Sequence, residues 1–222
     1  DLAYNNNDFG FGIFSILHDK TKEENLFISP FSISTALSMT LNGAAGDTKQ
    51  EMLNTLKYLN WNPDNLNSAY RDLLQVLPVL DKDIKMKNAN SIWYRDGFSV
   101  LPEFLNVNNK YFSAEIKNKD FSKGSTITEI NTWVENKTEG KIKDIINSID
   151  PATVMFLINA IYFKGQWKYK FDKKNTANEH FYLENGNTVG VEMMHGSEMN
   201  LPYFPNEKFS MVDIPYGDSI FS

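Results

Sequence analysis

An apolar run in the second half of the chain predicts a buried strand. From Val154 to Phe163 the residues are apolar except for Asn159, and polar and apolar positions do not alternate. This pattern is typical of a strand covered on both faces, and a membrane-spanning helix would need about twice the length. A buried carboxamide without partners costs about 1–3 kcal/mol. Asn159 is therefore either an incidental, satisfied core residue or a polar residue with a function.

Helical periodicity and helix-start signals predict several helices before this strand. The first is expected to begin with Asp8 as its N-cap and to bury Phe9 and the apolar positions that follow it. Ser29-Pro30 is typical of an N-cap followed by Pro at the first helical position. That helix is expected to end at Asn42-Gly43, with Gly in the left-handed conformation.

Two capping boxes and the apolar spacing indicate the remaining helices. Thr48 with Glu51 and Thr126 with Glu129 have the reciprocal Ser/Thr-x-x-Glu pattern. The expected helices therefore begin near 48 and 126, the latter continuing to 138, and two others cover 66–77 and the residues after Pro102.

Alternating and short apolar segments predict the strands. The expected strands are 25–28, 84–94, 114–121, 153–163, 179–183, 188–194, 201–204, 208–214 and 219–222. Asn185-Gly186 is typical of a hairpin turn, and Pro205-Asn206 is expected to turn a second hairpin. Helices thus precede a mixed sheet and hairpins, which indicates an α+β fold. We expect no linker, and residues 1–222 are treated as part of one domain.

Composition excludes several classes of function. The chain has 222 residues, a net charge of −6 and 41% hydrophobic residues, and only two of its 22 basic residues are Arg. An acidic, Arg-poor chain has no general attraction for nucleic acid or for an anionic membrane, so neither is an expected partner. Cysteine is absent, which removes disulfides, a thiol nucleophile and thiolate metal sites. No signal peptide begins at Asp1, although a mature chain would have lost one.

Residues that commonly carry catalysis do not form recognisable motifs. His18, His180 and His195 are far apart in the sequence and lack metal-ligand spacing. The segment from Gly43 to Gly46 lacks the Gly-Lys-Ser/Thr ending of a phosphate loop. We therefore expect no enzyme activity, no catalytic residue, no metal and no cofactor.

Several motifs in a fixed order resemble those of the serpin family, the serine protease inhibitors. They are NLFISPFSIS (25–34), LNGAAGDT (41–48), NANSIW (88–93), WVENKTEGKI (133–142) and NAIYFKGQWKYKF (159–171), followed by LPYF and DIPYGD in the final hairpins. The resemblance covers nearly the whole chain. A protein similar to an inhibitory bacterial serpin would fit the cysteine-free composition.

The resemblance implies a fold and a set of site residues. Serpins have helices packed on three β-sheets; Thr153–Phe163 would be the third strand of the large sheet A, with the helix 126–138 lying across it. Ser29, Ser32 and Asn159 match the polar "shutter" beneath the place where that sheet opens. Lys164, Gly165 and Trp167 match the "breach", where a reactive loop first enters.

The implied activity is inhibition of a serine protease as a suicide substrate. The protease cleaves an exposed reactive loop, which then inserts into sheet A and traps the acyl-enzyme. The alternative is a non-inhibitory serpin-like carrier, chaperone or other binding protein. The family also implies secretion.

The chain is expected to be only the N-terminal portion of such a domain, up to the second sheet. The reactive loop, with its reactive bond, and the C-terminal strands of the family have no counterpart before Ser222. Besides the protease, the implied partner is therefore the protein's own C-terminal remainder. The isolated chain is expected to inhibit no protease and to be insoluble, molten or associated with that remainder.

Overall fold

The computed structural model describes residues 1–21, 25–183, 185–196 and 200–222. Contacts divide the chain into two compact units, each made of two segments. The first unit consists of Asp1–Pro78 and Met86–Tyr162, and the second of Val79–Lys85 and Phe163–Ser222. No helix in the described part of the chain combines the length and hydrophobicity needed to cross a bilayer.

The first unit contains the helices and a three-stranded sheet. The helices are α1 (Leu2–Lys20), α2 (Pro30–Leu41), α3 (Gly46–Thr55), α4 (Pro63–Val76), α5 (Pro102–Phe112) and α6 (Gly124–Lys137), with a short 3₁₀ turn η1 (Leu77–Val79) after α4. The strands are β1 (Lys85–Arg95), β2 (Glu115–Lys119) and β3 (Met155–Lys164), in the order β2-β1-β3. The helix 126–138 and the strands 84–94, 114–121 and 153–163 were thus predicted within a few residues.

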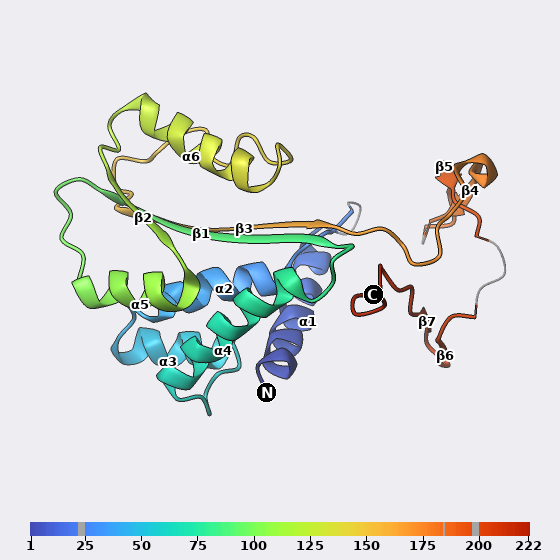
Figure 1. Ribbon diagram of the computed structural model, residues 1–222, viewed down its shortest axis with the longest axis horizontal. Coiled ribbons are helices and arrows are strands. Elements are labelled where there is room, and N and C mark those ends of the chain that lie inside the picture. The colour runs from blue at the N-terminus through green and yellow to red at the C-terminus, as the bar shows by residue number, and fades with distance from the viewer. Residues whose placement is uncertain (22–24, 184, 197–199) are drawn as a thin grey trace. The chain divides into compact units, whose positions relative to one another are not determined.

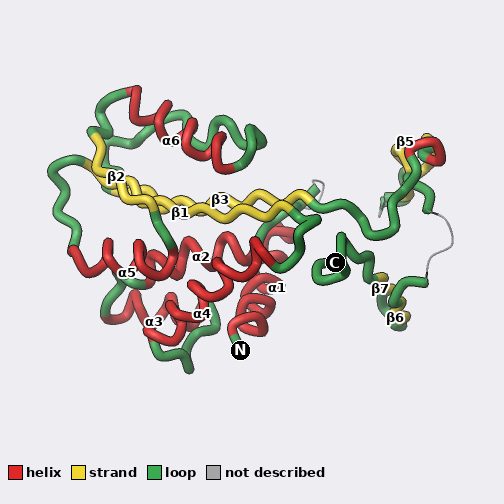
Figure 2. Tube along the Cα trace, viewed as in Figure 1, coloured by secondary structure: helices red, strands yellow, loops and turns green. Residues whose placement is uncertain are grey.

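The sheet is covered on both faces, as the apolar run of β3 predicts. α6 lies over one face and α1 to α5 lie on the other (Figures 1 and 2). β2 pairs in parallel with β1 from Ser91 opposite Glu115 onward. At the end of β1, Arg95 N donates to Val154 O at 2.9 Å, so β3 begins where β1 ends and runs in the opposite direction.

Neighbouring residues of β1 serve two different cores. Ile92 packs with the helices of one face, whereas Trp93 packs with Ile130 and Val134 of α6 and with Ile158 of β3. Successive side chains of a strand point to opposite faces, and both faces are buried here. The sheet is therefore the middle layer of the unit.

A buried pair of tyrosines joins the helices below the sheet. The hydroxyls of Tyr58 and Tyr70 lie 2.6 Å apart, and Tyr58 donates to Asn6 Oδ1 at 2.7 Å. Burial raises the pKa of both phenols above its ordinary value. Both groups therefore act as neutral hydrogen-bonding residues.

The start of α2 was predicted, whereas other helix ends differ from expectation. Ser29 is the N-cap of α2 and Pro30 its first residue. The first helix begins at Leu2 with Asp1 as N-cap, not Asp8, because the buried stripe extends back to Leu2. Gly43 is not left-handed; instead, a Cβ there would lie 3.0 Å from the Phe104 ring.

Both predicted capping boxes are wrong. α3 begins at Gly46 and α6 at Gly124, two residues before each Thr, and neither helix has a side-chain cap. Thr126 donates instead to the backbone oxygen of Asp120 at 2.7 Å. Tertiary packing, and not the local pattern, sets where these helices begin.

The second unit contains two hairpins. β4 (Ala177–Tyr182) pairs with β5 (Thr188–Met193), and β6 (Tyr203–Pro205) pairs with β7 (Ser210–Val212). η2 (Lys173–Asn175) precedes β4. Gly186 has a φ of 83° in the first turn, as predicted from Asn185-Gly186. The second hairpin also forms where expected, although its strands are shorter than predicted.

Two predicted strands are wrong. Residues 25–28 are irregular, with Phe27 97% exposed, and 219–222 follow a turn that begins at Tyr216. A strand needs a neighbour for its hydrogen bonds. Within the described chain, no strand pairs with either segment.

Candidate functional site

The carboxamide of Asn159 lies in the middle of β3 and joins two elements of the first unit. Ser32 of α2 donates its hydroxyl to Asn159 Oδ1. Asn159 Nδ2 donates to Asn88 Oδ1 at 2.9 Å and to Asn90 Oδ1 at 2.7 Å, both on β1. Both hydrogens of the amide nitrogen are therefore used, and the side chain connects β3 by hydrogen bonds to α2 and to β1.

The network continues beyond Asn159 in two directions. Ser29 Oγ accepts the backbone N–H of Ser32 at 3.3 Å, so the α2 cap holds the serine that contacts β3. Asn90 is buried, and its Nδ2 donates to Phe112 O at 2.7 Å, at the end of α5. The sequence-predicted residues Ser29, Ser32 and Asn159 are thus brought together.

Asn88 and Asn90 are members of this network that the sequence reasoning missed. Both belong to the 84–94 strand, which was correctly predicted from the alternation of its other residues. A signal was present: the two Asn are two residues apart, so they share one strand face with Met86 and Ile92. Two carboxamides on an otherwise apolar face need polar partners.

β3 is an outer strand of its sheet. In the part of the chain that the structure describes, β1 pairs with one edge of β3 and no strand pairs with the other. An outer strand exposes a row of backbone donors and acceptors that another strand can pair with. Within the described residues, the Asn159 network therefore lies on a strand that is paired along one edge.

Lys164, Gly165 and Trp167 lie at the end of β3 and after it. The Trp167 ring stacks on Tyr216, with centroids 4.1 Å apart and planes 15° apart. A Cβ at Gly165 would lie 2.8 Å from the Tyr216 ring, so only glycine fits there without a shift. Gly165 and Trp167 thus contact the same tyrosine, and Lys164 is the exposed last residue of β3.

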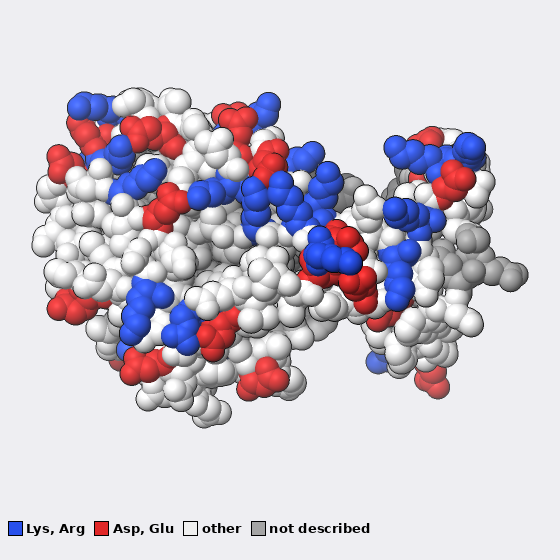
Figure 3. All heavy atoms as spheres, viewed as in Figure 1, with Lys and Arg blue, Asp and Glu red and all other residues white. Residues whose placement is uncertain are grey.

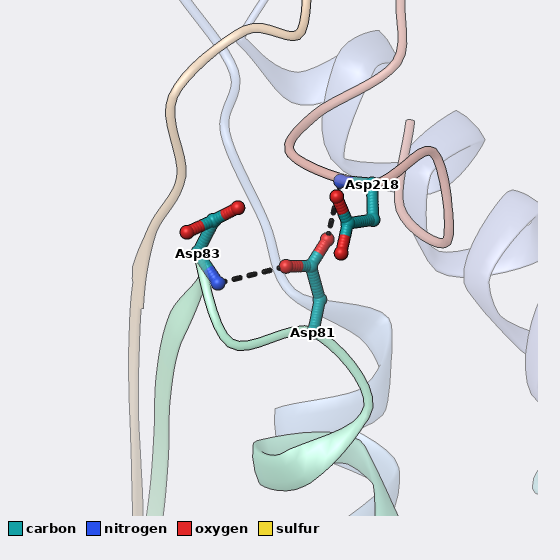
Figure 4. A group of neighbouring side chains, drawn as sticks. All are labelled: Asp81, Asp83 and Asp218. Carbon is teal, nitrogen blue, oxygen red and sulfur yellow. Dashed lines mark hydrogen bonds between the residues drawn. The ribbon is translucent and has the colours of Figure 1, made fainter.

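A group of three carboxylates in the second unit has a structural role. One carboxylate oxygen from each of Asp81, Asp83 and Asp218 lies within 4.8 Å of the other two. The buried Asp81 carboxylate accepts the backbone N–H of Asp83 at 2.8 Å and that of Asp218 at 2.9 Å (Figure 4). Both its oxygens are therefore used to hold the 81–83 turn and the Asp218 turn together.

The histidines and the surface charges have ordinary surroundings. His18 stacks on Phe14 in α1, and His195 Nε2 lies 2.7 Å from Glu179 Oε1 at the surface. His180 is an exposed residue of β4. On the face drawn in Figure 3, basic and acidic side chains both occur across the surface.

The family is decided by the match to a family model. The model described as "Serpin (serine protease inhibitor)" matches residues 4–222. The chain belongs to the serpin family. A serpin of the mouse, Serine protease inhibitor A3F, is 35% identical over 220 residues, which are 97% of this chain and 49% of that protein. The chain spans about half the length of the curated relatives it matches.

Solved serpin structures confirm the expected fold. The thermophilic serpin tengpin, in its latent state, has a TM-score of 0.86 and 35% identity over 97% of this chain and 57% of that one. Human thyroxine-binding globulin has a TM-score of 0.83 and 30% identity over 97% of this chain and 59% of that one. The chain therefore has the N-terminal part of a serpin fold.

Proposed function

We propose that this chain is the scaffold of a serine protease inhibitor that acts as a suicide substrate. A protease cleaves a reactive loop, and the loop inserts as a new strand into the sheet that contains β3. Insertion precedes hydrolysis of the acyl-enzyme, so the protease stays covalently trapped. The partners are a serine protease and the remainder of the serpin itself.

The observation that carries this proposal is the polar network that joins β3 to β1 and α2. Ser29, Ser32 and Asn159 are proposed as the shutter, to which the geometry adds Asn88 and Asn90. Neutral hydrogen bonds exchanged one for one have a small net cost, whereas a tightly packed apolar contact favours a single arrangement. A polar contact between α2 and β3 suits a sheet that must change its strand number.

Lys164, Gly165 and Trp167 are proposed as the breach. The Trp167 ring stacks on the Tyr216 ring, and Gly165 lacks the Cβ that would clash with that ring. Stacked rings separate without leaving unsatisfied polar atoms, so the contact suits a place where a loop enters. The proposal is that these residues guide the first inserted residues.

A non-inhibitory binding protein is the second candidate. It is favoured by the similarity to thyroxine-binding globulin, whose name states a ligand and not a protease. Small residues along the loop hinge would support inhibition, whereas bulky, charged or Pro residues there would support binding alone. Secretion is likewise a proposal, from the family.

The test is a covalent complex between the full-length protein and a serine protease. Purified protein is incubated with trypsin-like, chymotrypsin-like and elastase-like proteases and analysed on denaturing gels. We expect a denaturant-resistant complex with at least one protease, and none with the same protease lacking its nucleophilic serine. Cleavage of the loop without any complex would overturn inhibition and support the binding protein.

A further inference from the structure

The sequence contains two Asn-Gly pairs, Asn42-Gly43 and Asn185-Gly186. In such a pair the backbone nitrogen of the glycine can attack the side-chain carbonyl carbon of the asparagine, because glycine has no Cβ to hinder the approach. A bond forms between the glycine nitrogen and Asn Cγ, the bond from Cγ to Nδ2 breaks, and Nδ2 leaves as ammonia with the proton that the glycine nitrogen gives up. Water then opens the cyclic imide to aspartate or isoaspartate, so water is the one further reactant.

The attacking nitrogens of the two pairs have similar surroundings. Gly43 N donates to Thr40 O at 2.9 Å, and Gly186 N donates to Leu183 O at 3.0 Å. Each of these turn hydrogen bonds must open before the nitrogen can attack, and exposed turns open at low cost in free energy. The glycine nitrogen therefore does not distinguish the two pairs, and a difference in reactivity must come from the asparagine.

The carboxamide of Asn42 is held at both of its polar atoms. Its Nδ2 donates to Asn67 Oδ1 at 3.2 Å, and its Oδ1 accepts from Asn67 Nδ2 at 3.0 Å. The Asn42 backbone is helical, with a φ of −64° and a ψ of −18°, because this residue is the C-cap of α2. Attack by Gly43 would require the reciprocal amide pair with α4 to break and the end of α2 to unwind. The fold therefore protects Asn42.

The carboxamide of Asn185 is arranged for the reaction. Asn185 Oδ1 accepts the backbone N–H of Asn187 at 2.9 Å. Negative charge develops on this oxygen when a nitrogen adds to Cγ, and an N–H group already directed at it stabilises that charge, as in an oxyanion hole. Asn185 is exposed in the turn between β4 and β5, so ammonia can leave into solvent and water can reach the imide.

We propose that Asn185 is a site of spontaneous conversion to aspartate and isoaspartate, and that Asn42 is protected from it by the fold. The isoaspartyl product has an additional main-chain carbon between Asn185 and Gly186. The length of a hairpin loop fixes the register of its strands, and here Tyr182 pairs with Thr188 directly beyond the turn. Conversion therefore loosens the β4-β5 hairpin as the protein ages.

The test compares the two pairs in the full-length protein, which is incubated in neutral buffer, digested and analysed by peptide mass spectrometry. In the folded protein, Asn185 should convert at least about tenfold faster than Asn42. In urea, the two rates should agree within about threefold, because the local chemistry of the two pairs is the same. Equal rates in the folded protein would overturn the proposal, as would an Asn185 that converts in urea and not in the folded protein.

Two variants separate the added charge from the altered main chain. Asn185→Gln, whose longer side chain closes the ring far less readily, should show no conversion at this position. Freshly purified Asn185→Asp adds the charge alone and should leave the backbone amides of β4 and β5 as protected from hydrogen exchange as in fresh wild type. Aged wild type, with isoaspartate detected by enzymatic methylation, should exchange these amides faster. Equal protection in aged and fresh wild type would overturn the effect on the hairpin.

Discussion

Replacing Asn159 with Ala should lower the free energy of unfolding by about 2 kcal/mol. The side chain accepts one hydrogen bond from Ser32 and donates two, to Asn88 and Asn90. A neutral hydrogen bond contributes about 1 kcal/mol net, which gives about 3 kcal/mol for the three. Relaxation of the neighbouring side chains recovers about 1 kcal/mol of this, so about 2 kcal/mol remains.

The assay is equilibrium unfolding of the full-length protein in urea, followed by tryptophan fluorescence. Asn118→Ala, at an exposed position, is the control and should change stability by less than about 0.5 kcal/mol. Ser32→Ala completes a double-mutant cycle. The cycle should give a coupling energy of about 1 kcal/mol between Ser32 and Asn159, because they share a hydrogen bond.

The reasoning would be refuted by two results together. One is an Asn159→Ala variant as stable as Asn118→Ala, which would mean that water replaces the carboxamide at no cost. The other is an unchanged rate of conversion to the loop-inserted or polymeric form. Both would remove Asn159 from the proposed shutter.

Three further changes have expected outcomes. Trp167→Ala removes the ring stacked on Tyr216 and should cost about 2 kcal/mol in thermal unfolding; an unchanged melting temperature would contradict the stacking argument. Partial burial alone would raise the pKa of Glu115. The hydrogen bonds from Lys137 and Trp133 lower it by more, so the pKa lies below its ordinary value. Glu115→Gln should therefore destabilise at neutral pH, and its difference from wild type should vanish as pH falls through the lowered pKa; a pH-independent difference in melting temperature would contradict this. The isolated 222-residue chain should form no covalent complex with a protease. It should also sediment as aggregates without a cooperative melt, because apolar residues such as Phe27 are almost fully exposed; a sharply melting monomer would contradict this expectation.

Local signals predicted those elements that local chemistry determines. Ser29-Pro30 gave the start of α2, and the unalternating run gave β3, because each depends on residues next to it in the sequence. The 25–28 and 219–222 strands were wrong because a strand depends on a neighbour that its own residues do not specify. The capping boxes at Thr48 and Thr126 were wrong because their helices begin two residues earlier.

The candidate site could be predicted only where a polar residue interrupts an apolar pattern. Asn159 was found because it is the one polar position in its run. Asn88 and Asn90 were missed because β1 has polar residues at many positions, so the two carboxamides did not stand out. Their pairing with Asn159 depends on the register between β1 and β3, which no local motif encodes.

The Asp81 carboxylate has a consequence for the order of folding. It binds the Asp218 backbone N–H across 137 residues, and the length-dependent entropy cost of closing a loop that long is about 4 kcal/mol. The cost falls when the intervening chain is already compact. The second unit, which needs residues 79–85 from the N-terminal half, should therefore assemble late, after the β2-β1-β3 sheet has formed. During synthesis on the ribosome, residues 79–85 are made long before Asp218, so the second unit can be completed only after both hairpins have been synthesised.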